Sequence, residues 1–187
     1  MFFLSKTPIW QTFLILILAI LVFLPLLKLA PYRFFRILTF LNPDFDPMGF
    51  GYQIKQSLIA IGSGKIFGLG LGLSQQKFGI LPQAFSDTIF AIFAEETGFF
   101  GSLFLISLYL MFFLINFKIG KEKRGEFEKL LAFGIPFWIC FQAFFNISAM
   151  VRILPLGGIP LPFVSYGGSH LATEIGAVGI LLKVSKS

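Results

Sequence analysis

The residues with the clearest capacity for chemistry are carboxylates at the start of a long apolar stretch, LPQAFSDTIFAIFAEETG, residues 81–98. Asp87 comes directly before the apolar run, and Glu95 and Glu96 lie inside it. A carboxylate within hydrogen-bonding distance of a hydroxyl can act as a general base. Acids inside an apolar segment normally face the protein interior and pair with a polar group. The stretch therefore indicates catalysis or structural pairing.

The three acids differ in the roles that their spacing allows. Asp87 is well placed as an N-cap, the commoner role for such a residue, and a capping carboxylate can also face a cavity. On a helix, Asp87 and Glu95 would lie roughly 12 Å apart, whereas glycosidase carboxyl pairs lie about 5 to 9.5 Å apart. Glu96 would lie on the opposite side of the helix. We therefore expect acid–base work from Asp87 alone and structural pairing from Glu95 and Glu96, one of which could line a cavity.

Basic residues before this stretch could meet an anionic group. Lys65 lies in the glycine-rich IGSGKIFGLGLG, residues 61–72. This segment fails the phosphate-binding loop pattern, because Ile59 replaces the first Gly and Ile66 replaces the required Ser or Thr. It also fails the dinucleotide-binding fingerprint, since no strand–helix alternation surrounds it. Lys65 and Lys77 still flank a surface that could bind phosphate.

Other polar residues have simpler explanations. Gln142 and Asn146 are four residues apart, so one face of a helix carries both, and hydrogen bonding between helices is the default interpretation. His170 is the only His, and no neighbouring cluster supports a zinc site. Glu174 is a further acid within an apolar segment, and its role is open.

The amino-acid composition indicates what kind of structural element positions these residues. The chain has 187 residues, of which 56% are hydrophobic and 13% are charged, against about 25% charged in a typical soluble domain. A single Cys excludes an internal disulfide. In so apolar a chain, the net charge of +6 favours anionic lipid head groups or a phosphorylated lipid over nucleic acid.

Apolar segments long enough to span a bilayer, which takes roughly 20 residues, predict an all-α integral membrane protein. The chain would be one membrane domain of four transmembrane helices. Pro25 and Pro136 fall inside spans and are expected to kink rather than break them. The predicted spans are residues 9–30, 88–117, 130–150 and 163–182.

The charge pattern predicts the orientation. The basic segment KIGKEKRGEFEK, residues 118–129, and two Lys near the C-terminus are expected to be cytoplasmic. Both termini would then be cytoplasmic, and residues 31–87 would form a large extracytoplasmic loop. Turn signals and the helical spacing of GYQIKQSLIAIGSG, residues 51–64, predict a short interfacial helix within this loop. An anionic ligand would explain the basic residues on this outer side.

Four stretches, in this order, resemble the SEDS family (shape, elongation, division and sporulation proteins), and are closer to its division branch than to its elongation branch. The resemblance runs from about Pro8 to the C-terminus. The stretches are PYRFFRILTFLNPDFDPMGFGYQIKQSLIAIGSGKIFGLGLGLSQQK, LPQAFSDTIFAIFAEETGFFG, FQAFFNI and LPFVSYGGS.

The resemblance implies a peptidoglycan glycosyltransferase of the bacterial cytoplasmic membrane. Family members polymerise lipid II, a disaccharide-peptide on an undecaprenyl pyrophosphate carrier, at the outer face of the membrane. A sugar hydroxyl attacks an anomeric carbon and lipid pyrophosphate leaves. The family pattern Pro-Glu-x-His-Thr-Asp maps its essential Asp onto Asp87, with Gln83 and Phe85 replacing the usual Glu and His.

The leaving pyrophosphate requires positive charge from Arg, Lys or a divalent cation. No cofactor beyond that cation is expected. The implied partners are lipid II, membrane lipids, a class B penicillin-binding protein and other division proteins. The substrate-binding candidates are Arg33, Arg36, Gln53, Gln56, Lys65, Lys77 and Ser86.

Besides Gln83 and Phe85, the chain departs from the family in two further ways. His170 replaces a usual Ser, and about four spans replace the family's ten, so the chain matches the C-terminal part only. Two alternatives to a polymerase stay open: a transporter that moves lipid II across the bilayer, and a non-catalytic scaffold that holds division proteins.

Overall fold

The structure is a computed structural model that describes residues 10, 11, 13–18, 21, 31–78, 81, 82 and 84–186. All regular structure within these residues is helical, as the sequence predicts. Most of the first predicted span, including Pro25, lies outside the described residues; those of its residues that are described are helical. The elements are α2 (Pro31–Leu41), η2 (Pro43–Phe45), α3 (Phe50–Ser63), α4 (Ile89–Glu122), α5 (Glu126–Met150) and α6 (Gly168–Lys186).

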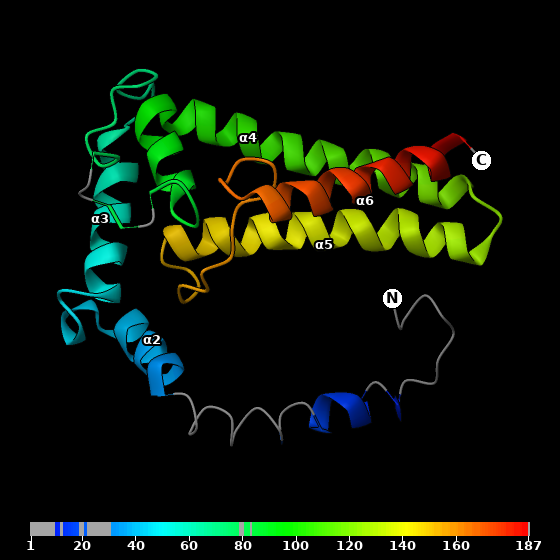
Figure 1. Cartoon of the computed structure of the whole chain (residues 1–187), viewed down its shortest axis with the longest axis horizontal. Helices are drawn as coiled ribbons and strands as arrows, with labels where there is room; N and C mark the ends of the chain where they lie inside the picture. Colours follow the sequence, from blue (N-terminus) through cyan, green and yellow to red (C-terminus); the bar gives the residue numbers. More distant parts are fainter. Residues whose placement is uncertain are drawn as a thin grey trace.

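The helices α4, α5 and α6 run alongside one another and form the long body of the molecule (Figure 1). Among the described residues, α4 and α5 are the two helices long and apolar enough to cross a membrane. They begin near the predicted starts of the second and third spans, and α5 ends at the predicted residue. As predicted, α5 continues through Pro136 without a break. The last helix, α6, begins at Gly168, five residues after the predicted start of the fourth span.

A kink in α4 at Gly98 is the main feature that the sequence analysis did not predict. Gly98 has φ 68° and ψ −161°, outside the helical region. A Cβ at this position would come within 2.3 Å of the Gly68 amide nitrogen, so the close approach requires glycine. The loop after α3 attaches to α4 on both sides of the kink. Leu69 N donates to Glu95 O at 3.0 Å, and Phe99 N donates to Lys65 O at 2.9 Å.

Helix α3 lies across the end of the α4–α6 body (Figure 1). It agrees with the predicted short helix, although its location at a membrane surface stays a prediction. Asp46 accepts hydrogen bonds from the backbone nitrogens of Gly49 and Phe50, both at 2.9 Å. These satisfy amides that a helix start leaves unpaired.

A buried cluster joins these elements at the end of the body. Ile54 of α3, Phe90 of α4 and Ala143 and Met150 of α5 pack with Leu161 of the loop before α6. Residues 84–88 connect into α4 at this cluster, so the packing positions the turn that carries Asp87.

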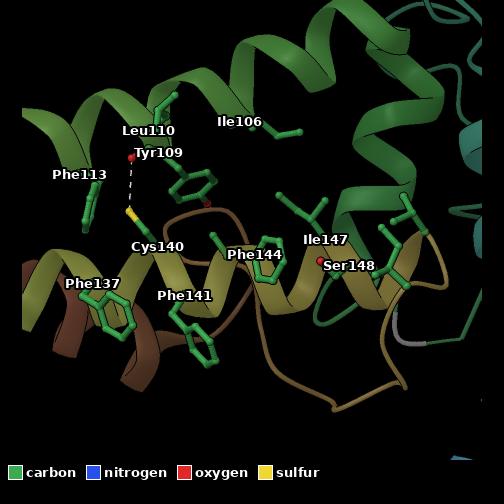
Figure 2. Close-up of a pocket in the computed structure, with 13 residues that line it drawn as sticks. Ile106, Tyr109, Leu110, Phe113, Phe137, Cys140, Phe141, Phe144, Ile147 and Ser148 are labelled. Atoms are coloured by element: carbon green, nitrogen blue, oxygen red, sulfur yellow. Dashed lines mark hydrogen bonds between the residues drawn. The ribbon is translucent and has the colours of Figure 1, made fainter.

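A groove along α4 and α5 has a different character. It has a volume of about 540 Å³ and an almost wholly apolar lining. Figure 2 shows Tyr109 and Phe113 of α4 and Phe137, Phe141 and Phe144 of α5, which line this groove. None of the residues that line it belongs to the turn 84–88.

Candidate functional site

Asp87 lies in the turn immediately before α4 and is half-buried. The N-cap of α4 is Thr88, which makes no side-chain capping bond, so the interpretation of Asp87 as an N-cap is wrong. The Thr88 hydroxyl instead donates to the Pro82 carbonyl at 3.1 Å. The turn therefore ends one residue later than the capping pattern implies, and the Asp87 carboxylate is not committed to the helix amides.

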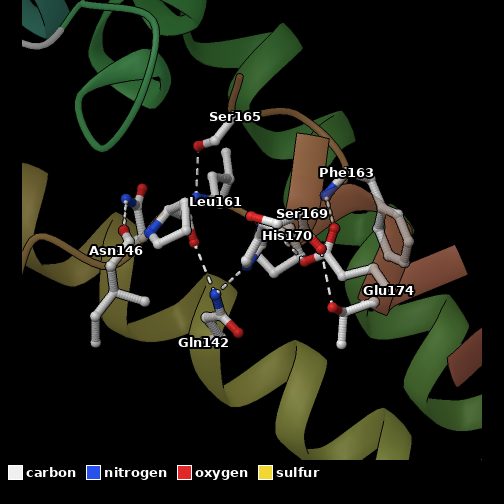
Figure 3. A network of polar contacts seen from close by, with 12 residues as sticks. Gln142, Asn146, Leu161, Phe163, Ser165, Ser169, His170 and Glu174 are labelled. Atoms are coloured by element: carbon white, nitrogen blue, oxygen red, sulfur yellow. Dashed lines mark hydrogen bonds and ion pairs between the residues drawn. The ribbon is translucent and has the colours of Figure 1, made fainter. Parts of the chain in front are cut away.

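The backbone carbonyl of Asp87 is held by Asn146 of α5. One amide group, Asn146 Nδ2, donates to Asp87 O and to Ile159 O, at 2.7 Å each. Asn146 is 2% exposed, so these bonds form where water does not compete. The sequence analysis expected Asn146 to bond between helices; its partners are the Asp87 turn and the loop before α6 (Figure 3).

The segment after Ile159 also fastens the turn. The Ser165 hydroxyl accepts from Leu161 N and donates to Ser86 O, at 2.6 Å each. Tyr166 N donates to Phe85 O at 2.8 Å. The carbonyls of residues 85, 86 and 87 are therefore bonded to residues about 60 to 80 positions further along the chain. Ser165 and Tyr166 of the SYGGS stretch position this turn.

Arg36 and the Asp87 carboxylate converge at Gly158. A Cβ on Gly158 would lie 3.6 Å from Asp87 Oδ2 and 3.8 Å from Arg36 Nη1, and Gly158 has φ +64°. Arg36 also donates to Leu156 O at 3.4 Å and lies over the Phe50 ring, 4.7 Å from its centroid. The structure thus brings one predicted catalytic residue and one predicted cation to the same glycine.

Ser86, another predicted site residue, contacts the same carboxylate. Its hydroxyl donates to Asp87 Oδ1 at 2.5 Å. Asp87 also lines a crevice with Asn146, Met150 and Gly158 that is too narrow to admit a water molecule. One face of the turn is therefore closely packed against α5 and the loop before α6.

Glu95 has the structural role that the sequence analysis expected. Its side chain is 1% exposed and accepts from the Ser63 hydroxyl at 3.4 Å, from the Ser74 hydroxyl, and from the backbone nitrogens of Gln75 at 3.3 Å and Gln76 at 3.4 Å. This one carboxylate holds the loop that follows α3 against α4.

Glu96 pairs with a predicted substrate-binding cation. Lys77 Nζ lies 2.8 Å from Glu96 Oε1, with both side chains largely buried. The pairing role predicted for Glu96 is confirmed, and Lys77 is committed to this ion pair in the structure.

The remaining candidates lie apart from this cluster of bonds. Gln53 is buried and Gln56 half-buried on α3, and Lys65 is exposed after α3 with φ 47°. None of the hydrogen bonds described above around Asp87 involves these three side chains. Arg33 lies in α2, and its side chain, like residue Gln83, is outside the described part of the chain.

A second polar network, which the sequence analysis only partly foresaw, holds the loop before α6 (Figure 3). Gln142 Nε2 donates to Pro160 O at 3.2 Å and lies 2.7 Å from His170 Nε2. An amide NH₂ group can only donate, so Gln142 Nε2 also donates to His170 Nε2. His170 Nε2 is then the acceptor, which places the imidazole hydrogen on Nδ1. His170 Nδ1 lies 3.2 Å from Glu174 Oε1. The α5–α6 bond expected of Gln142 is confirmed.

Glu174, to which the sequence analysis assigned no role, has a clear one. It is 1% exposed, and Oε2 accepts from Phe163 N at 2.9 Å. Glu174 therefore anchors the start of the SYGGS segment, while Asn146 anchors the residues just before it. Within the described residues, no group of three or more His, Cys, Asp and Glu side chains could hold a metal ion.

The whole chain is similar to known proteins. The model of the FtsW/RodA/SpoVE family, described as "Cell cycle protein", matches residues 1–187. A "Probable peptidoglycan glycosyltransferase FtsW" of Buchnera aphidicola subsp. Schizaphis graminum is 46% identical and matches over 97% of this chain and 52% of its own length. The protein of that name from Idiomarina loihiensis is 44% identical over 98% of this chain and 46% of its own length. The chain thus spans about half the length of the curated relatives it matches.

One solved structure is similar over nearly the whole chain. That structure is described as "Structural coordination of polymerization and crosslinking by a peptidoglycan synthase complex". The TM-score is 0.67 at 26% sequence identity, and the match covers 95% of this chain and 49% of the other.

Proposed function

Because the chain belongs to the FtsW/RodA/SpoVE family, we propose that it carries the catalytic carboxylate of a peptidoglycan glycosyltransferase that polymerises lipid II. The observation that carries this proposal is the position of Asp87. The main chain of its turn is bonded to two distant segments, and its carboxylate and Arg36 both approach Gly158. A pre-organised acid beside a cation is suited to a reaction in which a hydroxyl loses a proton and a phosphate leaves.

In the proposed reaction, Asp87 is the general base. A hydroxyl of the acceptor sugar attacks the anomeric carbon of the donor and gives its proton to the Asp87 carboxylate. The new glycosidic bond forms as the bond from the anomeric carbon to the pyrophosphate oxygen breaks, and undecaprenyl pyrophosphate leaves with the electron pair. Protonated Asp87 then returns its proton to solvent.

Positive charge assists the departure of the pyrophosphate. Arg36 is the strongest candidate, because it lies at the same glycine as the Asp87 carboxylate. Lys65 is exposed and could contact the phosphates from the loop after α3. Lys77 is a weaker candidate because it is paired with Glu96. Participation of Arg33, Gln53, Gln56 or a divalent cation stays a prediction.

Ser86 has a supporting role in this mechanism. Its hydroxyl donates to Asp87 Oδ1, so it orients the carboxylate with its second oxygen, Oδ2, toward Gly158. We assign the proton transfer to that second oxygen.

The proposed setting is the outer face of the cytoplasmic membrane, with residues 31–87 outside and both termini inside. The length and apolar character of α4 and α5 support a membrane location. The proposed partner is a class B penicillin-binding protein, which would cross-link the new strands in division. The similar solved structure, described as coordinating polymerization and crosslinking, supports such a partnership.

The direct test is glycan-strand formation from labelled lipid II by the purified chain, with and without the cross-linking partner. Asp87→Asn is the test variant, and Asp44→Asn is a matched control, since Asp44 is exposed in η2. Polymer from the wild type and the control, and none from Asp87→Asn, supports the proposal. Equal polymer from all three overturns the role of Asp87.

A second outcome would favour a different function. The chain spans about half the length of its relatives. If the folded chain makes no polymer in any condition but still binds the cross-linking partner, it is a scaffold and not a polymerase.

A further inference from the structure

The loop that follows α3 carries its apolar side chains outward and its nearest polar side chains inward. We call residues 65–73 the apolar loop; its exposed apolar side chains are those of Ile66, Phe67, Leu69, Leu71 and Leu73. Phe67 and Leu71 are each 80% exposed, whereas Ser74 and Gln76, which follow the loop, are buried. A run of large exposed apolar side chains marks a surface that contacts another protein or a membrane.

The backbone of the apolar loop is bonded to α4 before and after Gly98, and Figure 1 shows the loop beside the start of α4. Before the kink, Gly70 N donates to Glu96 O at 3.0 Å. After the kink, Phe100 N donates to Ile66 O at 3.3 Å. The depth of the loop relative to a membrane therefore follows from the depth of this part of α4.

The sequence of α4 indicates where the membrane boundary falls. Residues 97–117 carry no charge, and the charged residues Glu96 and Lys118 bound this run. A helix needs roughly 20 residues to cross the hydrocarbon core of a bilayer, so the run has the length of one crossing. Because Lys118 is at the end expected to be cytoplasmic, the outer boundary lies close to Gly98, where the apolar loop is attached.

An aromatic cluster joins the apolar loop to the uncharged part of α4. The ring centroids of Phe67 and Phe100 are 5.6 Å apart, and those of Phe99 and Phe100 are 6.1 Å apart. All three side chains are exposed, as is that of Phe104, about one turn further along α4. The exposed surface of the loop is therefore continuous with a surface of α4 that a bilayer would cover.

We propose that the apolar loop contacts the outer leaflet of the membrane, with its apolar side chains among the acyl chains and its backbone at the level of the lipid head groups. Amphipathic segments that lie in this boundary bury their apolar side about 5–10 Å deep. Non-helical backbone exposed to lipid does not occur in the hydrocarbon core, so the main chain stays at the boundary. The inference rests on the membrane location and orientation proposed above and is independent of the reaction.

A bilayer fits this surface better than a second protein does. Protein interfaces carry about one hydrogen bond per 100–200 Å², and Lys65 is the one polar side chain within residues 65–73. Acyl chains require no such partner. The exposed Lys65 adjoins Ile66, and a lysine at the edge of an apolar surface extends its charge toward the phospholipid phosphates.

The test measures the depth of the apolar loop by electron paramagnetic resonance. A nitroxide label is attached at Phe67→Cys in a Cys140→Ser background, since Cys140 is the single native cysteine and serine keeps a donor for Tyr109 O. The full chain is reconstituted in vesicles of phosphatidylethanolamine and phosphatidylglycerol. The collision rates of the label with O₂, which concentrates among acyl chains, and with a water-soluble nickel complex report its surroundings.

Two reference positions calibrate the measurement. Phe104→Cys lies in the uncharged run of α4 and reports lipid, and Asp44→Cys lies at an exposed charged position of η2 and reports water. We expect the ratio of O₂ to nickel collisions at Phe67→Cys to be shifted from the Asp44→Cys value toward the Phe104→Cys value. Leu71→Cys should show the same shift.

Two outcomes overturn the proposal. A ratio at Phe67→Cys equal to that at Asp44→Cys places the apolar loop in water. Low collision rates with both reagents mean that protein covers the loop. The vesicles contain no lipid II, so failure of this proposal leaves the role of Asp87 unaffected, and failure of the polymerisation assay leaves this measurement unaffected.

Discussion

Asp87 and Glu95 are acids eight residues apart in the same stretch, yet the structure uses them in opposite ways. Asp87 is half-buried, and distant residues hold its turn chiefly through the main-chain carbonyls of residues 85–87. Glu95 is 1% exposed, and its carboxylate accepts from two serine hydroxyls and two backbone amides. Backbone hydrogen bonds fix the position of Asp87, whereas hydrogen bonds to its carboxylate fix that of Glu95.

The difference teaches how a carboxylate can be assigned a role in an apolar segment. Oxygens that already accept from several buried protein donors cannot reach a substrate hydroxyl, so Glu95 holds the fold. Main-chain bonds around Asp87 fix the place of its carboxylate, and Asp87 Oδ2 and Arg36 both approach Gly158. Burial of an acid is therefore a weaker sign of catalysis than the way in which the acid is held.

The largest expected effect is that of removing the Asp87 carboxylate on activity. Asp87→Asn should lower the rate of glycan polymerisation by about 10²- to 10⁴-fold, the usual contribution of a general base. The main-chain bonds to Asn146 and Ser165 remain, so the unfolding temperature should hardly change. Initial rates with labelled lipid II and thermal unfolding in detergent measure the two quantities. A rate within a few-fold of wild type would show that another group takes the proton.

The converse variant should damage the fold. Glu95→Ala leaves the Ser74 hydroxyl and the amides of Gln75 and Gln76 without their acceptor, and a buried donor without a partner costs about 1–3 kcal/mol. We expect the free energy of unfolding to fall by about 3 kcal/mol, measured by denaturant titration in micelles. Asp87→Ala, which removes the acceptor of the Ser86 hydroxyl, is the matched comparison. If both variants lose equal stability, the contrast between the two acids is wrong.

Asn146 tests whether the main-chain tether positions Asp87. Asn146→Ala removes the donor to Asp87 O and Ile159 O. A small displacement of a catalytic group can lower a rate by about 10- to 100-fold, so we expect a loss of that size. The control is Asn116→Ala, because Asn116 donates within α4 to Phe112 O at 2.8 Å. Equal activity in the two variants would limit Asn146 to a packing role.

The smallest effect is expected at an exposed pair far from both acids. Lys55 Nζ lies 2.5 Å from Asp44 Oδ1, and this hydrogen bond and charge lower the pKa of Asp44. A lowered folded-state pKa contributes stability above the unfolded pKa, which is lost as pH falls through the folded value. Lys55→Ala should therefore change the unfolding temperature slightly at neutral pH and not at all at about pH 2. A larger difference at acid pH than at neutral pH would contradict this sign.

Much of the helical organisation was predictable from local sequence. Apolar length predicts α4 and α5, and helical spacing followed by Gly64 predicts α3. The kink at Gly98 was not predicted, because a glycine in an apolar run gives no sign that another loop approaches its backbone so closely. The start of α6 was also missed, since Ser165 and Tyr166 bond to the Asp87 turn instead of entering the helix.

The candidate site was predicted in part. Asp87, Ser86 and Arg36 were named from the sequence. In the structure Ser86 bonds to the Asp87 carboxylate, and that carboxylate and Arg36 both approach Gly158. Asn146 was assigned to helix pairing, and no role was predicted for Gly158 or Glu174. Their contacts join residues far apart in the chain, and neither spacing nor residue type reports such contacts.

The sequence by itself determined that the chain is apolar and helical, that it resembles one family of membrane enzymes, and that Asp87 is its candidate base. These properties depend on composition, on periodicity within one helix and on short motifs. Only the tertiary structure decided that Glu95 holds a loop, that Lys77 pairs with Glu96, and that the loop after α3 exposes its apolar side chains beside the kink in α4. The reason is physical: the role of a polar group depends on which donors and apolar walls reach it, and those come from other segments of the folded chain.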